Sequence, residues 1–227
     1  MPILDSVNIG SPVSNPYKQG RSTGIDKRPQ SGPIFVRPPG PKHGGLGSGL
    51  VGDFIGDGKH HGGDEQAVYA YAREDLDGWE TRLNRSLPNG FFGENLTTRR
   101  LDVSGALLGE RWRVGEEVEL VVTTPRIPCS TFRGWVGERG WLKTFTAVAQ
   151  PGAYLAVVTP GHVRAGDPIE VVYQPDHDVT VSLAYRATTT ERELLPHLLT
   201  AGDDLVEELR DAARRGETIE LDPEPRH

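Results

Sequence analysis

The sequence predicts a mainly β protein: a β-barrel with a few short helices and a small helical cluster near its C-terminal end. Glycine and proline break helix interiors, and they number 28 and 18 among 227 residues, a density that excludes a helical bundle. Short apolar runs recur between turn residues at regular spacing, which is typical of a closed or nearly closed barrel. The net charge of −7 argues against a general nucleic-acid binder, which needs a basic face.

The first elements along the chain are three strands separated by loops. Residues 3–9, 33–36 and 50–55 each contain apolar β-formers bounded by turn residues, so each predicts a strand. The glycine-rich stretch 41–49 predicts a mobile loop before the third strand. No apolar run approaches the ~18–20 residues of a membrane span. The N-terminus also lacks the pattern of a signal peptide, so we expect a cytoplasmic protein without a membrane partner.

The apolar spacing changes to a helical period over residues 66–83. This stretch predicts one or two helical turns followed by a second helix near 76–83. Asp64 follows two glycines and is placed to cap the first helical turn. Short strands then return, and their predicted ranges are 101–103, 112–114, 118–122, 154–158, 169–173 and 179–183.

The C-terminal part of the chain has helical spacing again. Leucines recur at helical intervals between residues 188 and 215, and they predict a cluster of short helices. The Asp203-Asp204 pair is placed to cap the last of these helices. We therefore predict a β-barrel domain over 1–186, a three-helix extension over 187–217 and a disordered tail over 218–227.

Cys129 is the single cysteine, which excludes an intramolecular disulfide. It follows a β-rich run and two stiffening prolines, so we expect it on a loop leaving a strand. Arg126 and Arg133 flank it, and nearby positive charge lowers the pKa of a cysteine. The thiolate is the form that attacks or binds soft metals. The alternative, more frequent for a lone intracellular cysteine, is a small buried apolar residue.

The second candidate segment is Lys59 to Asp64. Gly62 and Gly63 precede a predicted helix start, where backbone N–H groups bind anions such as phosphate. The alternative is an ordinary loop before a helix. A metal site built from His60, His61 and His162 is a weaker reading, because neighbouring residues of a strand point to opposite faces.

The third candidate segment follows Gly90 and gathers hydrogen-bonding side chains. Glu94, Asn95, Thr97 and Thr98 precede Arg99 and Arg100. Such a group can hydrogen-bond a polar heterocycle and its phosphate. The alternative is a polar turn that leads into a strand.

Taken together, these segments resemble the MOSC family, named after the C-terminal domain of molybdenum cofactor sulfurase, and most closely its YiiM-like branch. Each motif alone is weak, but their shared order is specific. The motifs that carry the resemblance are residues 60–64 with 67–71, 87–90 with 92–97, 108–115, 125–129, 151–154 and 165–167.

The resemblance implies a β-barrel that binds the molybdenum cofactor, a pterin dithiolene carrying a phosphate. It implies that Cys129 is the catalytic residue and the molybdenum ligand, and that Arg126 neutralises the phosphate or orients the loop. The cofactor-binding positions that it implies are His61, Gly62, Gly63, Asn95, Thr97 and Arg126, with Lys59, Arg99 and Arg133 as further candidates. It is also compatible with a pyridoxal-phosphate-binding-like description.

The activity that the resemblance implies is reduction of small N-hydroxylated compounds, such as hydroxylaminopurine-type bases. An electron-transfer reductase of the flavin or haem type would then be the partner. The alternative is a cofactor or sulfur carrier without turnover of its own, in which Cys129 carries a persulfide.

One segment departs from the family pattern. At residues 52–57 the resemblance leads us to expect a polar Gly-Asp-x-Gln-Ala-Asp stretch, but Phe54 and Ile55 are apolar. If this segment touches cofactor or substrate, the departure changes specificity or cofactor loading.

Overall fold

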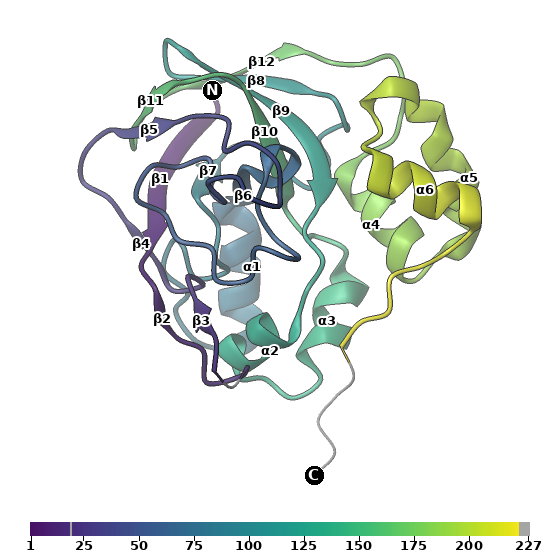
Figure 1. Cartoon of the computed structure of the whole chain (residues 1–227), viewed down its shortest axis with the longest axis horizontal. Helices are drawn as coiled ribbons and strands as arrows, with labels where there is room; N and C mark the ends of the chain where they lie inside the picture. The colour runs from purple at the N-terminus through teal and green to yellow at the C-terminus, as the bar shows by residue number, and fades with distance from the viewer. Residues whose placement is uncertain (19, 223–227) are drawn as a thin grey trace.

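An eight-stranded sheet forms the body of the molecule (Figure 1). The computed structural model describes residues 1–18 and 20–222. The strand order is β12–β8–β9–β10–β6–β7–β1–β4, in which β6 and β7 are parallel and the other neighbours are antiparallel. The strands are β1 (Ile3–Gly10), β4 (Lys27–Pro29), β6 (Val68–Ala72), β7 (Leu96–Arg99), β8 (Arg111–Val114), β9 (Val118–Pro125), β10 (Ala153–Thr159) and β12 (Ile169–Tyr173).

The predominance of strands confirms the mainly β prediction, but a closed barrel is not confirmed. The strand order ends at β12 and β4, and within the described ranges these two edges are not paired. The sheet does curl far enough to touch itself, since an isolated bridge joins Ile3 of β1 to Pro168, just before β12. The Leu4 N–H also donates to the Asp167 carbonyl at 2.9 Å.

Two small ribbons flank the sheet, and one predicted strand is absent. Strands β2 (Val13–Ser14) and β3 (Ser22–Thr23) pair, as do β5 (Ile34–Val36) and β11 (Gly161–Val163). The strand predicted for 50–55 is wrong: Leu50 forms a single bridge with Val36, and Gly52 then turns the chain at φ 90°. The strand predicted for 101–103 is also wrong, because residues 101 and 102 are irregular and a turn begins at residue 103.

The helices are short and lie outside the sheet (Figure 1). They are α1 (Arg73–Leu83), α2 (Ser130–Val136), α3 (Trp141–Val148), α4 (Val181–Thr189), α5 (Leu195–Leu198) and α6 (Glu207–Arg215), with 3-10 turns η1 (Asp64–Gln66), η2 (Arg192–Leu194) and η3 (Leu199–Asp204).

The helical turns predicted at the start of residues 66–83 are wrong, because Val68–Ala72 is strand β6, whereas the second helix predicted near 76–83 is confirmed as part of α1. All five residues of β6 are buried, so its two faces are both apolar and the alternation that marks a strand is missing. The predicted cap Asp64 is also wrong. Gly63 precedes η1, and the Asp64 carboxylate accepts the Gly40 N–H at 2.8 Å instead.

The strand predicted for 179–183 is wrong because Thr180 starts helix α4. Its hydroxyl accepts the Leu183 N–H at 3.0 Å, the usual N-cap arrangement. The predicted boundary between residues 186 and 187 falls inside α4, while the division into domains stays a prediction. Asp203 and Asp204 do not cap α6, whose N-cap is Val206.

The C-terminal helices stand beside the sheet, and the chain after α6 runs back toward α2 and α3 (Figure 1). The Ile219 N–H donates to the Thr188 carbonyl at 2.8 Å. The Asp222 carboxylate accepts the Ser130 N–H at 2.6 Å. Residues 218–222 of the predicted disordered tail are therefore held against the body, and residues 223–227 lie outside the described part of the chain.

Two backbone segments approach each other so closely that only glycine fits. A Cβ added at Gly56 would overlap the Ser22 carbonyl oxygen, and one at Gly24 would overlap the Phe54 carbonyl oxygen. The segment around β3 therefore packs directly on the loop 53–57 without side chains between the two backbones.

Gly56→Ala should destabilise the protein by about 1–3 kcal/mol, because the new methyl group overpacks the contact with Ser22. Gly58→Ala is the matched control, since a Cβ there meets nothing within 4 Å. Denaturant unfolding of both variants measures the difference. Equal stability of the two variants would show that the contact between the segments is loose.

Candidate functional site

Cys129 lies on the short loop between β9 and α2, which confirms the predicted position after a strand. It is the N-cap residue of α2 and has extended backbone angles (φ −123°, ψ 173°). Helix α2 is anchored by Phe132, which is fully buried among the aromatic rings of Phe92, Trp141 and Phe145. The half-buried Cys129 packs on the edge of this aromatic cluster.

The surroundings of Cys129 favour its thiolate form. Burial by itself raises the pKa of the thiol, but a hydrogen bond with His61, the positive charge of Arg126 and the Phe132 N–H together outweigh it. The net effect lowers the pKa of Cys129 from 9.0 to about 6. Near neutral pH the side chain is therefore mainly a thiolate, which is a nucleophile and a ligand for soft metals.

We expect the alkylation rate of Cys129 by iodoacetamide to reach half its maximum near pH 6. Because the chain has no other cysteine, mass spectrometry reports this site alone. His61→Ala should move the midpoint to higher pH, since the variant loses a hydrogen bond to the thiolate. A wild-type midpoint near pH 9 would contradict the thiolate assignment.

Two cavities meet at Cys129. The first measures about 120 Å³ and lies between the N-terminal segment 15–27, the loop 53–57 and the start of the Arg126–Cys129 loop. Four cationic side chains and two carboxylates line it, so its charged groups are predominantly positive: Lys18, Arg21, Lys27, Arg126, Asp53 and Asp57.

Arg126 is buried in the wall of the first cavity and forms no ion pair with the residues that the structure describes. Its side chain is 6% exposed, and its guanidinium carbon lies 3.6 Å from the ring centroid of Phe132 and 5.7 Å from that of Tyr69. Its Nη1 has no hydrogen-bond partner among the described residues. A buried donor on a charged group is normally satisfied, so this atom indicates an anionic ligand.

A buried ion pair between Lys27 and Asp53 forms the opposite wall. Asp53 also accepts the Gly10 N–H at 2.8 Å, the Ser48 hydroxyl at 2.7 Å and the Asn95 amide at 2.9 Å. The Asn95 oxygen in turn accepts the Tyr69 N–H at 3.2 Å. This network fixes loop 53–57 to the sheet and uses the hydrogen-bonding groups of Asn95.

The predicted site residues divide into two groups. Those that line the first cavity are Cys129, His61, Gly62, Asn95 and Arg126. Those outside its lining are Gly63, Thr97, Lys59, Arg99 and Arg133.

The second group makes other contacts. The Gly63 N–H donates to the Gly47 carbonyl at 3.0 Å, so it is not free to bind an anion. Thr97 is fully buried, and its hydroxyl donates to Glu94 at 2.9 Å. Arg99 pairs with Asp5 at 3.1 Å.

The remaining two predicted residues lie near the surface. Lys59 is exposed, and Arg133 donates to the Asp222 carbonyl at 3.4 Å. The two glycines 62 and 63 are required by packing, because a Cβ at Gly62 would lie 2.8 Å from the Gly47 carbonyl oxygen.

The first cavity is also lined by charged residues that the sequence patterns do not assign to the site: Lys18, Arg21, Lys27, Asp53 and Asp57. Lys27 belongs to a segment that carries no motif, so only the fold brings it to Asp53. Asp53 and Asp57 match the two aspartates of the polar pattern expected at residues 52–57, and this match was the available signal.

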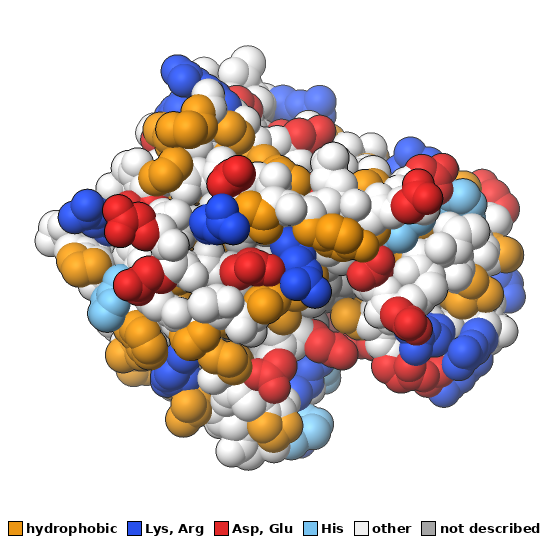
Figure 2. Space-filling view, turned by 90° about the horizontal axis from the view of Figure 1, so that it is seen from above, with side chains coloured by type: hydrophobic (Ala, Val, Ile, Leu, Met, Phe, Trp, Pro, Cys, Tyr) orange, Lys and Arg blue, Asp and Glu red, His pale blue; other side chains and the backbone are white. Residues whose placement is uncertain are grey.

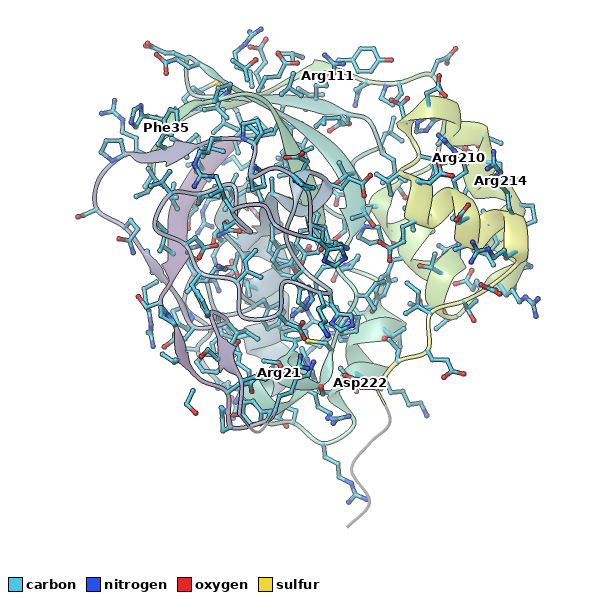
Figure 3. The ribbon with its side chains drawn as sticks, viewed as in Figure 1. Arg21, Phe35, Arg111, Arg210, Arg214 and Asp222 are labelled. Carbon is cyan, nitrogen blue, oxygen red and sulfur yellow. The ribbon has the colours of Figure 1, made fainter. Side chains whose placement is uncertain are left out.

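The second cavity measures about 330 Å³ and opens on the other side of Cys129. Residues 124–128 form one wall, and α6 with residues 219–222 forms the other. Figure 3 shows Asp222 at the end of the segment that returns from α6. Cys129 therefore borders both cavities.

Neither a membrane span nor a histidine metal site is found among the described residues. No helix there is long and apolar enough to cross a bilayer. No group of three or more His, Cys, Asp or Glu side chains could hold a metal ion in that part of the chain. His162 instead lies on β11, with its ring 5.0 Å from that of Phe35.

Comparison with curated proteins finds relatives over most of the chain. Uncharacterized protein YflK of Bacillus subtilis (strain 168) is 30% identical over 182 residues, which cover 80% of this chain and 78% of that protein. Protein YiiM of Escherichia coli (strain K12) is 29% identical over 171 residues, 74% of this chain and 71% of that protein. A protein named Reductase from Gibberella moniliformis is 27% identical over 158 residues, 68% of this chain but 26% of its own length.

The fold and the family profile agree with these relatives. The crystal structure of YiiM from Geobacillus stearothermophilus superposes with a TM-score of 0.75 and 23% identity, and covers 95% of this chain and 99% of that chain. The sequence profile of the MOSC domain matches residues 57–170, which include His61, Asn95, Arg126 and Cys129. The chain therefore belongs to the MOSC domain family, and within it to proteins similar to YiiM.

Proposed function

We propose that this protein binds the molybdenum cofactor at Cys129 and reduces small N-hydroxylated compounds, such as hydroxylaminopurine-type bases. The observation that carries the proposal is a thiolate in one cavity with a buried arginine whose Nη1 has no hydrogen-bond partner among the described residues. Family membership and the reductase name of one relative support redox chemistry at this site.

The chemistry of the donor set fits this cofactor. A thiolate is a soft ligand suited to molybdenum, and Cys129 is mainly ionised at neutral pH. Arg126 offers a buried donor for the phosphate. Arg21 and Lys18 line the same cavity and share the Asp57 carboxylate at 2.9 and 3.6 Å, so together these three residues leave one positive charge there. We propose that these residues hold the phosphate end of the cofactor while Cys129 holds the metal.

The cofactor, when bound, supplies two-electron chemistry at the N–OH bond. The balanced reaction is R–NHOH + 2e⁻ + 2H⁺ → R–NH₂ + H₂O. His61 hydrogen-bonds the Cys129 sulfur and lines both cavities, so it is placed to hold a proton beside the thiolate. The electrons come from a partner reductase of the flavin or haem type in this proposal.

The first cavity must widen to admit a whole pterin. Its volume of about 120 Å³ is below the roughly 300–1,000 Å³ of usual ligand sites. Phe54 and Ile55, the apolar departures from the family pattern, line this cavity. Ile55 also packs on Gly62, where an added Cβ would lie 3.1 Å from its Cδ1.

Ile55→Ala should raise the molybdenum content of the purified protein by roughly 2-fold or more, because it removes side-chain volume from this wall. The matched control is Val51→Ala, an exposed position outside the cavity lining. Metal analysis of the proteins purified in parallel gives the comparison. If both variants match the wild type, the wall does not limit loading.

The proposal is tested on protein purified from a host that makes the molybdenum cofactor. Metal content is measured, and reduction of an N-hydroxylated base is assayed with an artificial reductant. Molybdenum with turnover supports the proposal. Molybdenum or labile sulfur without turnover favours the carrier function, and zinc without molybdenum contradicts both.

A further inference from the structure

We propose that the second cavity is the substrate site of this activity, and that its carboxylates select substrates carrying N–H donors or positive charge. The identity of the reaction rests on the proposed function, whereas the charge selection at Cys129 does not. The cavity lies between residues 124–128 and the C-terminal wall made by α6 and residues 219–222.

The two cavities share one wall around the reactive atom. Cys129, His61, Gln66, Tyr154 and Lys18 line both of them. A group held by Cys129 in the first cavity is therefore reached by a second molecule from the other cavity. Because the cofactor would bind in the first cavity and the substrate in the second, the two molecules would not compete for the same volume.

The charged groups of the two cavities have opposite balances. The first has four cationic side chains against two carboxylates. The second has one cationic side chain, Lys18, against the three carboxylates of Glu208, Glu220 and Asp222. A cleft lined by one sign of charge concentrates the opposite sign, so the first cavity favours a phosphate and the second favours cationic molecules.

Two carboxylates of the second cavity are available to a ligand. Glu220 has no hydrogen-bond or ion-pair partner within the described part of the chain, and Glu208 lies 3.9 Å from Lys42. Asp222 is instead held by the Ser130 N–H. The buried side-chain oxygen of Gln66 also has no partner among the described residues, so it adds a free acceptor beside Cys129.

The remaining walls suit a small flat heterocycle. Ile127, Leu209 and Ile219 give the cavity apolar surface, and its volume of about 330 Å³ falls within the usual range for small-molecule sites. Figure 2 shows a hollow between the body that contains the sheet and the part formed by the C-terminal helices, with acidic side chains on both sides of it. The C-terminal wall is fixed by the hydrogen bond from the Ile219 N–H to Thr188 of α4 and by the one from the Ser130 N–H of α2 to Asp222.

The test uses Cys129 as its own reporter. The protein without added cofactor is treated with a cationic and an anionic methanethiosulfonate reagent (2-aminoethyl and 2-sulfonatoethyl), and each rate is divided by the rate with a free thiol. We expect the cationic reagent to react faster with the wild type. The double variant Glu208→Gln, Glu220→Gln should reduce this preference by roughly 5-fold or more, because it removes two charges from the route.

Glu207→Gln is the matched control, because Glu207 lies on the same helix, pairs with Arg210 at 3.0 Å and does not line the cavity. It should leave the preference unchanged. A preference for the anionic reagent that the double variant does not alter would overturn the inference, since the thiolate would then be reached through the basic cavity.

A second measurement separates this inference from the proposed function. In the loaded enzyme, the double variant should raise KM for an N-hydroxylated aminopurine and lower it for an N-hydroxylated compound with a carboxylate, with molybdenum content unchanged. If the loaded double variant turns over with unchanged KM values, the second cavity is not the substrate site, and the proposed reductase function is not affected by that result. Reagent rates as expected without any turnover support the charge selection and overturn the reductase function.

Discussion

Cys129→Ser should reduce N-hydroxyl reduction by roughly 100-fold or more while the fold stays intact. Serine has a similar size, but its hydroxyl does not ionise near neutral pH and is a poor ligand for a soft metal. Serine is also a favoured N-cap residue, so α2 should keep its start at residue 130. Turnover, molybdenum content and thermal unfolding of the variant measure these effects.

The difference in stability between the wild type and the Cys129→Ser variant should depend on pH in one direction. The pKa of Cys129 is lowered from 9.0 to about 6 in the folded protein, so the native state binds fewer protons than the unfolded state between these values. Its contribution to the free energy of unfolding is therefore complete above pH 9 and is lost as the pH falls through 6. The free energy of unfolding of the wild type, relative to that of Cys129→Ser, should increase as the pH rises from about 6 to 9. An unstable but active variant would make Cys129 a packing residue only.

Arg126→Gln should lower the molybdenum content by roughly 10-fold or more and raise the pKa of Cys129. The variant removes both the buried donor for the phosphate and a positive charge that stabilises the thiolate. Metal analysis and the ultraviolet absorbance of the thiolate as a function of pH measure the two effects. Arg99→Gln is the control, because Arg99 pairs with Asp5 outside the cavity lining.

The stability of the cofactor-free Arg126→Gln protein separates binding from packing. The guanidinium stacks on Phe132, and losing this contact costs about 0.5–2 kcal/mol. Removing a buried charge that lacks a hydrogen-bond partner offsets this loss. We therefore expect little change in the free energy of unfolding. A large loss of stability with normal molybdenum content would mean that Arg126 is structural.

Local sequence patterns predict many single strands, helices and loops, but they do not predict which residues from distant segments pair with each other. Cys129 was found because its flanking prolines and arginine are neighbours in the sequence. Strand β6 was missed because burial on both faces removes the alternation on which a strand prediction rests. The Lys27–Asp53 pair was missed because no periodicity links two residues that only the sheet brings together.

Two glycines show a further limit of motif reasoning. Gly62 and Gly63 have the composition of an anion-binding turn, and the sequence alone does not tell which partner their backbone meets. The structure assigns the Gly63 N–H to the Gly47 carbonyl. The anion-binding role predicted for the Gly63 N–H is not supported, because this N–H already donates to a carbonyl of the loop that contains Gly47.

The bridge between Ile3 and Pro168 has a consequence for how the chain folds. Strand β1 pairs locally with β4, but its contacts with β7 and with Pro168 join residues far apart in the sequence. The Ile3–Pro168 bridge forms only after most of the chain is available, and such non-local contacts slow folding. Until then this end of β1 lacks its partner, and an unpaired strand edge can pair with other chains during folding.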